Sequence, residues 1–151
     1  MAGGDLDGDV YHMFWDEDLM AALAKARIHE PQPYEKPSTE EVNRETFKSE
    51  RLEDMFCYYL EHDYLGKVAN LHINLCDFLG PQGPMDARCL RLSMLQAVAV
   101  DFAKHGKCIQ KSDFSDIEET TKTKPDFLEP VHGRLRESEG ILGELFRMVD
   151  P

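Results

Sequence analysis

Positive charge is scarce in this sequence, which has 17 lysines and arginines against 29 aspartates and glutamates among 151 residues, and a formal net charge of −12. A protein that follows a nucleic-acid backbone usually shows a basic surface, so this balance counts against nucleic-acid binding by this chain alone. Long apolar runs are also missing, since none approaches the roughly 18–20 residues that span a bilayer. The first residues contain neither a basic nor an apolar segment, so we expect no secretory signal and no membrane partner.

Closely paired cysteines are a further absence. The four cysteines stand at positions 57, 76, 89 and 108 without a C-x-x-C pair, which favours a reduced, intracellular protein over a disulfide scaffold or a zinc site. Cys76 and Cys89 fall within apolar helical patterns, and we expect both in the core. We find no second His or Cys at ligand spacing from His72, so we expect His72 to be structural rather than a metal ligand.

The densest chemistry lies near the N-terminus, in the stretch GGDLDGDVY over residues 3–11. Asp5, Asp7 and Asp9 stand two residues apart, and side chains at that spacing in a strand lie roughly 6.5–7 Å apart, too far for one ion. Gly8 can adopt backbone angles that let the chain curl, which would bring Asp9 back toward the other two. Gathered carboxylates repel one another, and a hard divalent cation relieves that repulsion. All-oxygen ligands favour Mg²⁺, Mn²⁺ or Ca²⁺.

Three interpretations of this stretch are open. An EF-hand loop needs glycine at its sixth position and glutamate at its twelfth, where this sequence has Val10 and Asp16, and it also needs a preceding helix. A solvated acidic turn is common for clusters of aspartate and glycine. A catalytic metal loop between two strands is the third, because residues 10–15, VYHMFW, are rich in β-branched and aromatic side chains and predict a strand.

Helices are expected over much of the remaining chain, which is long enough for one sizeable core. Asp18 is expected to cap a short helix over residues 20–27, and three prolines in residues 28–37 predict a linker. A capping box of Ser38 and Glu41 opens a helix to about residue 61. Apolar periodicity predicts a helix over 65–79, a turn at 80–84, and a helix from Asp86 with Gly106 as its C′ residue.

The C-terminal third has a weaker pattern. Residues 109–119 are polar and acidic, residues 120–125 predict an extended loop, and residues 133–149 predict a last helix. Gly140 and Gly143 weaken that helix by about 1 kcal/mol each relative to alanine, which suggests close packing against another element. Asn70, Asp77 and Asp101 lie with His72 on the two apolar helices, and we expect all four to be hydrogen-bonded in the core, because buried polar groups need partners.

A set of motifs in a fixed order resembles the eukaryotic cellular RNA-dependent RNA polymerases of RNA silencing. The motifs are GGDLDGDVY at 3–11, FWD at 14–16, DL at 18–19, LG at 65–66, ANLH at 69–72, Asp77, CL at 89–90, AVDFAKHG at 99–106, KPDF at 124–127 and SxxILGxL at 138–145. Only residues 28–53 are dissimilar. The acidic motif is specific, and the later motifs are persuasive together.

The resemblance implies a mainly α fold with a short N-terminal β piece that belongs to a double-psi β-barrel polymerase core. Residues 1–27 would supply the catalytic metal loop and strand of the barrel, residues 28–37 a proline-rich linker, and residues 38–151 the helical C-terminal region. Asp5, Asp7 and Asp9 would be both the catalytic residues and the ligands of Mg²⁺, with Mn²⁺ possible. The partners implied are an RNA template, nucleoside triphosphates and proteins of the silencing machinery, in the nucleus or the cytoplasm.

The resemblance also implies a role for Lys104, because the family has a lysine at this place, where its charge would lie near the nucleotide phosphates. The rival interpretation is a lysine that complements the dipole at a helix C-terminus. His105 departs from the threonine usual in the family, which puts any hydroxyl contact there in doubt.

The implied function is synthesis of complementary RNA by nucleotidyl transfer. Because a basic channel is missing, we expect the chain to be the C-terminal piece of a longer polymerase and inactive by itself. Two alternatives are a catalytically inactive helical remnant that acts as an interaction module, and a subunit related to DNA-dependent RNA polymerases, which share an Asp-x-Asp-Gly-Asp loop. The motifs at 69–72 and 99–106 argue against the second alternative.

Overall fold

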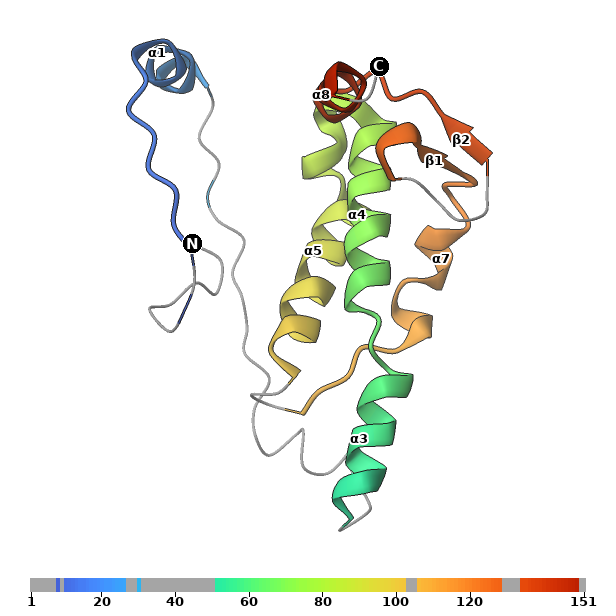
Figure 1. The fold of residues 1–151 in the computed structure, drawn as a ribbon. Coiled ribbons are helices and arrows are strands. Elements are labelled where there is room, and N and C mark those ends of the chain that lie inside the picture. The colour runs from blue at the N-terminus through green and yellow to red at the C-terminus, as the bar shows by residue number, and fades with distance from the viewer. Residues whose placement is uncertain are drawn as a thin grey trace. The chain divides into compact units, whose positions relative to one another are not determined.

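The computed structural model describes residues 8, 10–26, 30, 51–102, 106–128 and 134–149, and Figure 1 shows their elements as a ribbon. The chain divides into two compact units, Met1–Glu35 and Lys36–Pro151. Helices predominate among the described residues, as predicted, and they are accompanied by one two-stranded sheet. None of the helices in these ranges is long and apolar enough to cross a membrane. The implied double-psi barrel is not among the described elements.

The first unit contains helix α1, Glu17–Lys25. Its N-cap is Asp16, whose side chain accepts a hydrogen bond from the Leu19 N–H at 2.9 Å. The predicted cap, Asp18, lies instead in the first turn, so the prediction was wrong by about half a turn. The strand predicted over residues 10–15 was also wrong, since these residues form no regular element. A strand needs a hydrogen-bonded neighbour, and the described residues of this unit offer none.

Helix α3, Leu52–Glu61, begins the described part of the second unit. The sequence predicted a continuous helix from residue 38 to residue 61, and this was wrong at Arg51, whose φ of −95° and ψ of 128° are extended. The predicted capping box and the linker lie outside the described residues, apart from Glu30 of the linker. The helix ends where the His62 N–H donates to the Tyr58 carbonyl at 3.1 Å.

Helices α4, Leu65–Leu79, and α5, Ala87–Val100, lie against each other (Figure 1). The predicted bounds of α4 are confirmed, and so is the cap of α5, because the Asp86 side chain accepts from the Arg88 N–H at 2.9 Å. The end predicted for α5 was wrong: the helix stops at Val100 with Asp101 as its C-cap. Gly106 does have a positive φ of 71°, and its N–H donates to the Phe102 carbonyl at 2.6 Å.

A short 3-10 helix, η1 (Gly80–Met85), forms the corner between α4 and α5. Gly80 has a φ of +65°, which ends α4 in a conformation that favours glycine. Gly83 is buried, and a Cβ atom there would lie 2.4 Å from the carbonyl oxygen of Cys76. The corner therefore depends on two glycines for different reasons, a backbone angle at one and a close approach to α4 at the other.

The core lies between α4, α5 and the segment that follows them, which contains η2 (Lys111–Asp113) and α7 (Ser115–Glu118). Its buried apolar residues are Val68, Leu71, Leu75, Cys89, Leu92, Ile109, Phe114 and Ile117. Residues 109–119, which are mostly polar and acidic, thus also contribute three side chains to the core. Fully burying a side chain such as that of Phe114 contributes about 1.5–3 kcal/mol.

The C-terminal elements pack beside α4. Strand β1, Thr123–Pro125, pairs in parallel with β2, Arg134–Arg136, in the register Thr123 to Arg134 and Pro125 to Arg136. The 3-10 helix η3, Asp126–Leu128, follows β1, and helix α8, Ile141–Val149, ends the described chain. The helix predicted from residue 133 was therefore wrong over residues 134–140, and Gly133 lies outside the described residues. The close packing predicted at Gly143 is confirmed, because a Cβ atom there would lie 2.5 Å from the Cβ atom of Ser138.

Candidate functional site

The three predicted metal ligands, Asp5, Asp7 and Asp9, lie outside the described residues. Gly8, which stands between two of them, is described and has a φ of +135°. L residues rarely adopt this angle, so the backbone uses the freedom that the sequence predicted for this glycine. Beyond it, Val10, Met13 and Trp15 are 78%, 83% and 82% exposed. The acidic motif is thus followed by apolar side chains that no described residue buries.

Lys104, the predicted phosphate-binding residue, is also outside the described part of the chain, together with His105. The described residues before it are Asp101, the C-cap of α5, and Phe102. The ring of Phe102 stacks on that of Tyr59 in α3 with a centroid distance of 5.0 Å. The nearest described contacts of this region are therefore aromatic packing between α3 and the end of α5.

The structural role predicted for Asp77 is confirmed. Its carboxylate accepts hydrogen bonds at 2.6 Å from the Arg136 guanidinium and from the Ser138 hydroxyl. Asn74, which the sequence analysis did not single out, is 4% exposed, and its side chain donates to the Thr123 carbonyl at 3.2 Å and accepts from Arg136 at 3.0 Å. Asn70 is exposed, so its predicted place in the core was wrong.

A second charged contact fixes α8. Arg147 donates to the Asp126 carboxylate at 2.6 Å and to the Ser138 carbonyl at 2.9 Å. Burial by itself would raise the pKa of Asp126, but the hydrogen bond from the Ser138 N–H and the Arg147 guanidinium outweigh burial, and the pKa lies below its ordinary value of 3.8. These contacts hold the C-terminal elements together.

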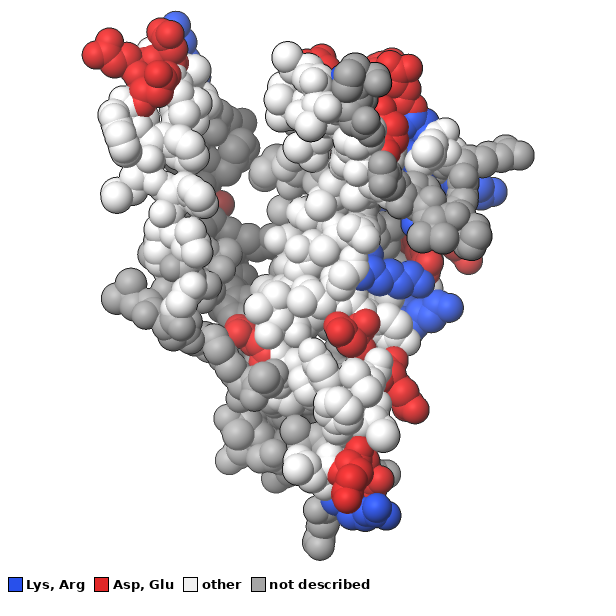
Figure 2. Space-filling model, in the orientation of Figure 1, with Lys and Arg blue, Asp and Glu red and all other residues white. Residues whose placement is uncertain are grey.

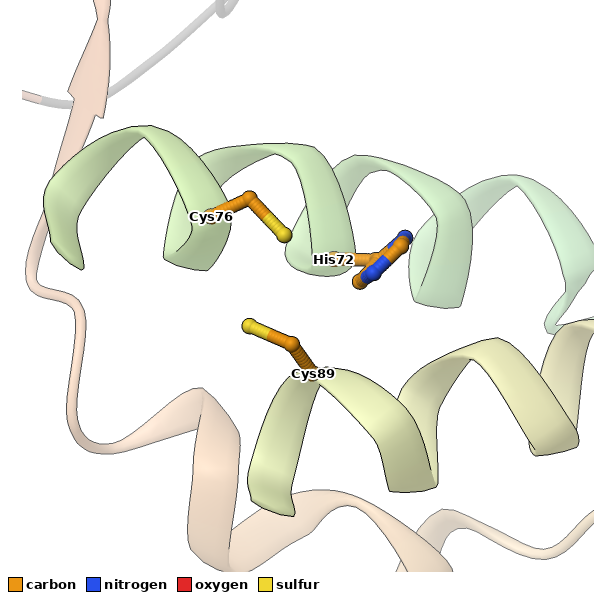
Figure 3. Close-up of side chains that lie close together, drawn as sticks. All are labelled: His72, Cys76 and Cys89. Carbon is orange, nitrogen blue, oxygen red and sulfur yellow. The ribbon is translucent and has the colours of Figure 1, made fainter. Parts of the chain in front are cut away.

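His72, Cys76 and Cys89 form a cluster, with one potential ligand atom from each residue and all three atoms within 4.8 Å of one another. Figure 3 shows the two sulfur atoms on the facing sides of α4 and α5, with the His72 ring one turn along α4. The core positions predicted for both cysteines are confirmed. The statement that no second ligand stands near His72 was wrong, because Cys76 lies one helical turn away and Cys89 arrives from the next helix.

The surroundings of this cluster disfavour the charged forms of Cys89 and His72. Burial raises the pKa of the Cys89 thiol to about 12, with a contribution from its contact with the Cys76 side chain. Burial also lowers the pKa of the His72 imidazole. The cluster thus places one imidazole and two cysteine side chains where α4 and α5 face each other.

The charged surface of the second unit carries both signs. In Figure 2, the blue and red atoms of that unit are interspersed on the viewed face rather than gathered into one basic area. Lys67, for example, pairs with Glu118 at 2.8 Å, and Arg91 pairs with Asp116. The described residues on this face therefore form no continuous track for a phosphate backbone.

Comparison with known proteins places the acidic motif in a family. The family model described as RNA dependent RNA polymerase matches residues 1–149, which is nearly the whole chain. A probable RNA-dependent RNA polymerase of rice, Oryza sativa subsp. japonica, is 34% identical over 149 residues. RNA-dependent RNA polymerase 6 of Arabidopsis thaliana is 33% identical over 150 residues, and RNA-dependent RNA polymerase 1 of Schizosaccharomyces pombe is 29% identical over 156 residues.

The coverage of these matches is very uneven. They include 98%, 98% and 97% of this chain, but only 12% of each of the three relatives. The chain thus spans about an eighth of the length of the proteins it matches. Within that span the similarity runs through the acidic motif and the helical region alike, and on this evidence the chain belongs to the RNA-dependent RNA polymerase family.

Proposed function

We propose that this chain is the C-terminal portion of the catalytic region of an RNA-directed RNA polymerase that copies RNA by magnesium-dependent nucleotidyl transfer. The observation that carries the proposal is the family match over residues 1–149, because it includes both the acidic motif and the helices. The N-terminal residues would belong to a double-psi β-barrel completed by other parts of the polymerase. Double-stranded RNA made in this way would serve RNA silencing.

The donor set of the acidic motif fits a hard divalent cation. Asp5, Asp7 and Asp9 offer only carboxylate oxygens, the ligand type that Mg²⁺ and Mn²⁺ prefer. The φ of +135° at Gly8 supports a bend between the second and third aspartates. A magnesium ion bound there supplies positive charge that lowers the pKa of an attacking 3′-hydroxyl and neutralises the triphosphate.

The roles of the chain's own residues follow from that chemistry. The three aspartates would hold and orient the cation, and Asp7 has a carboxylate neighbour on each side, so its loss should disturb the site most. Lys104 would place its ammonium group near the phosphates of the incoming nucleotide and offset their charge. The hydroxyl proton would leave the 3′-end as its oxygen attacks the α-phosphate, with pyrophosphate as the leaving group.

Exposed apolar surfaces support the presence of further polymerase structure around this chain. In α3, Leu52, Phe56 and Leu60 are 76%, 60% and 58% exposed, and in α8 Met148 is 78% exposed. Exposed apolar groups gathered along helices mark surfaces that pack against another body. We propose that the rest of the polymerase covers them and supplies the basic channel that the described residues lack.

The test is nucleotide incorporation by a complete polymerase that contains this segment. Such an enzyme is the longer polypeptide that contains the chain, or the rice relative with residues 1–149 grafted in place of its matched region. Asp7→Ala should lower incorporation by about 100-fold or more, at least the loss that follows removal of one charge-stabilising group from an active site. Glu17→Ala removes one negative charge from the exposed first turn of α1, outside the motifs, and should leave incorporation unchanged.

Three outcomes would contradict the proposal or its parts. Incorporation by Asp7→Ala within a few-fold of the unsubstituted enzyme would reject the aspartates as the metal site. Preference for a DNA template over an RNA template would favour the alternative of a DNA-dependent polymerase subunit. Polymerisation by the 151-residue chain by itself would contradict the expectation that it needs the rest of the enzyme.

A further inference from the structure

The cluster of His72, Cys76 and Cys89 has the geometry of a metal-binding site that the polymerase reaction does not use. His72 and Cys76 are four residues apart on α4, a spacing that places two side chains on one face of a helix. Cys89 approaches from the third residue of α5 (Figure 3). The α4–α5 pair therefore presents three ligands from two elements that the core already holds together.

The distances are close to those that a tetrahedral ion requires. With metal–sulfur bonds of about 2.3 Å and metal–nitrogen bonds of about 2.0–2.1 Å, ligand atoms around zinc lie about 3.5–3.8 Å apart. The three atoms of the cluster already lie within 4.8 Å of one another. The remaining gap is therefore at most about 1.0–1.3 Å, a distance that changes of side-chain torsion can close.

The chemistry of the donors selects the class of metal. Two thiolates and one imidazole are soft or borderline ligands, which favour Zn²⁺ or Cu(I) and disfavour Mg²⁺ and Ca²⁺. The acidic motif has the opposite preference, because all its donors are oxygen atoms. The chain thus contains two sets of potential ligands that would take different ions from one solution.

A route of entry and a fourth position are also available. His72 and Cys76 line a cavity of about 850 Å³ that Glu139 borders as well. Cys89 is fully buried, so an ion would enter from the cavity and reach this thiol last. Zinc is bound in proteins by three side chains and one water molecule in catalytic sites, so three ligands with a water in the fourth position form a known coordination set.

We propose that His72, Cys76 and Cys89 bind one Zn²⁺ ion that ties α4 to α5, with a water molecule from the adjoining cavity as the fourth ligand. Binding releases the two thiol protons to solvent and leaves the oxidation state of both sulfur atoms unchanged. The proposal is independent of the polymerase function.

The experiment measures metal binding by the intact 151-residue chain, purified under reducing conditions, in the presence of excess Mg²⁺ to occupy oxygen-ligand sites. We expect one Zn²⁺ per chain and a rise in the midpoint of thermal unfolding on adding it. Co²⁺ in place of Zn²⁺ should give thiolate-to-cobalt charge-transfer absorption and the visible bands of a tetrahedral ion. The charge-transfer bands report sulfur ligands directly. Binding of Co²⁺ by carboxylates at the acidic motif would not produce them.

Variants of His72 and of three cysteines supply the test and its matched control. Cys76→Ser, at a partly buried position, should weaken Zn²⁺ binding by at least about 100-fold, more than the loss of a contact outside the ligand shell. His72→Gln should act similarly, and it keeps the side chain polar. Cys57→Ser changes an exposed cysteine and should leave affinity, stoichiometry and the Co²⁺ spectrum as they were. Cys89→Ser is less informative because its side chain belongs to the core.

Three results would overturn the proposal. The first is unchanged Zn²⁺ affinity in both Cys76→Ser and His72→Gln. The second is a Co²⁺ complex without sulfur charge-transfer absorption. The third is rapid conversion of Cys76 and Cys89 to a disulfide by hydrogen peroxide at the same rate with and without saturating Zn²⁺, since bound metal would protect these thiolates.

Discussion

The residues around α1 and the residues of the α4–α5 pair are held by different forces. Helix α1 has a side-chain cap at Asp16 and acidic residues in its first turn, but it buries none of its side chains. Helices α4 and α5 bury five apolar side chains and share them with three from the segment after α5. Local hydrogen bonds thus define the first region, whereas tertiary packing defines the second.

Because of this difference, the residues proposed for catalysis and the residues that stabilise the fold lie in different parts of the chain. The acidic motif that carries the proposed reaction adjoins the region with little burial, while the region with the core carries no predicted catalytic aspartate. Most helical stability in proteins comes from packing of an apolar face rather than from caps. We therefore expect substitutions near the motif to alter function with little effect on stability, and substitutions in the core to do the reverse.

The largest effect should come from a pair of phenylalanines that differ in burial. Phe114 is fully buried and packs edge-on against Tyr64 with 5.5 Å between the ring centroids, whereas Phe14 is 67% exposed. Phe114→Ala should lower the free energy of unfolding by about 3–5 kcal/mol, and Phe14→Ala should change it by less than about 0.5 kcal/mol. Urea unfolding followed by circular dichroism measures both, and similar losses in the two variants would break the comparison.

Next in size is the charged contact under the C-terminal elements. Asp77→Ala should lower the free energy of unfolding by about 3 kcal/mol, because it leaves the Arg136 guanidinium, whose side chain is 19% exposed, without its carboxylate. Glu118→Gln, which breaks the half-exposed pair with Lys67, should cost less than about 1 kcal/mol. In the double variant Asp77→Ala/Arg136→Met part of the loss should return, and a loss equal to the sum of the single losses would argue against direct coupling.

Replacing either of two glycines by alanine should change the free energy of unfolding in opposite directions. Gly143→Ala should lower the free energy of unfolding by about 1–3 kcal/mol, because the new methyl group would lie 2.7 Å from the Ser138 carbonyl oxygen and the backbone would have to move. Gly66→Ala in α4 meets no atom within 4 Å and should raise it by up to about 1 kcal/mol. Thermal and urea unfolding of the two variants would show whether α8 is packed as tightly as described.

The smallest expected effect is a dependence on pH. The pKa of Asp126 is lowered in the folded chain, so its contribution to stability is complete above the ordinary value of 3.8 and declines as the pH falls below it. Arg147→Leu should raise this pKa and reduce that dependence. Carboxyl-carbon NMR titration of Asp126 measures the change, and Arg51→Leu, which alters an exposed pair with Glu53, should leave the pKa of Asp126 as it was.

The parts of the fold that could be predicted have local causes. Helix α4 and the cap of α5 follow from apolar periodicity and from Gly80 and Asp86, which act within a few residues of their own positions. Strand β2 could not be predicted in this way, because it is a strand only through its pairing with β1. Leu135 pairs with Lys124, and no local sequence pattern indicates which distant residue a strand will pair with. The burial of Ile109, Phe114 and Ile117 could not be predicted either. The first two are five residues apart and the last two are three apart, among charged neighbours, and this spacing is typical of neither a regular helix nor a strand.

The same division applies to the candidate sites. The acidic motif could be found because its three aspartates and Gly8 lie within five residues. The cluster around His72 could not, because its third member comes from α5 and only the packing of two helices brings it near. A site whose residues all lie in one short segment can be predicted from their spacing in the sequence. A site shared by two helices can be found only once the structure shows how the helices pack.

The corner at Gly83 has a consequence for how the chain can vary. The backbone of Gly83 approaches Cys76 too closely for a side chain, so this corner leaves little room for change. One residue inserted into the first turn of α5, before Cys89, would turn the rest of that helix by about 100° about its own axis. That rotation would move Leu92 out of the core and Cys89 away from His72, so we expect lineages of this protein to vary in length at other connections and hardly at all here.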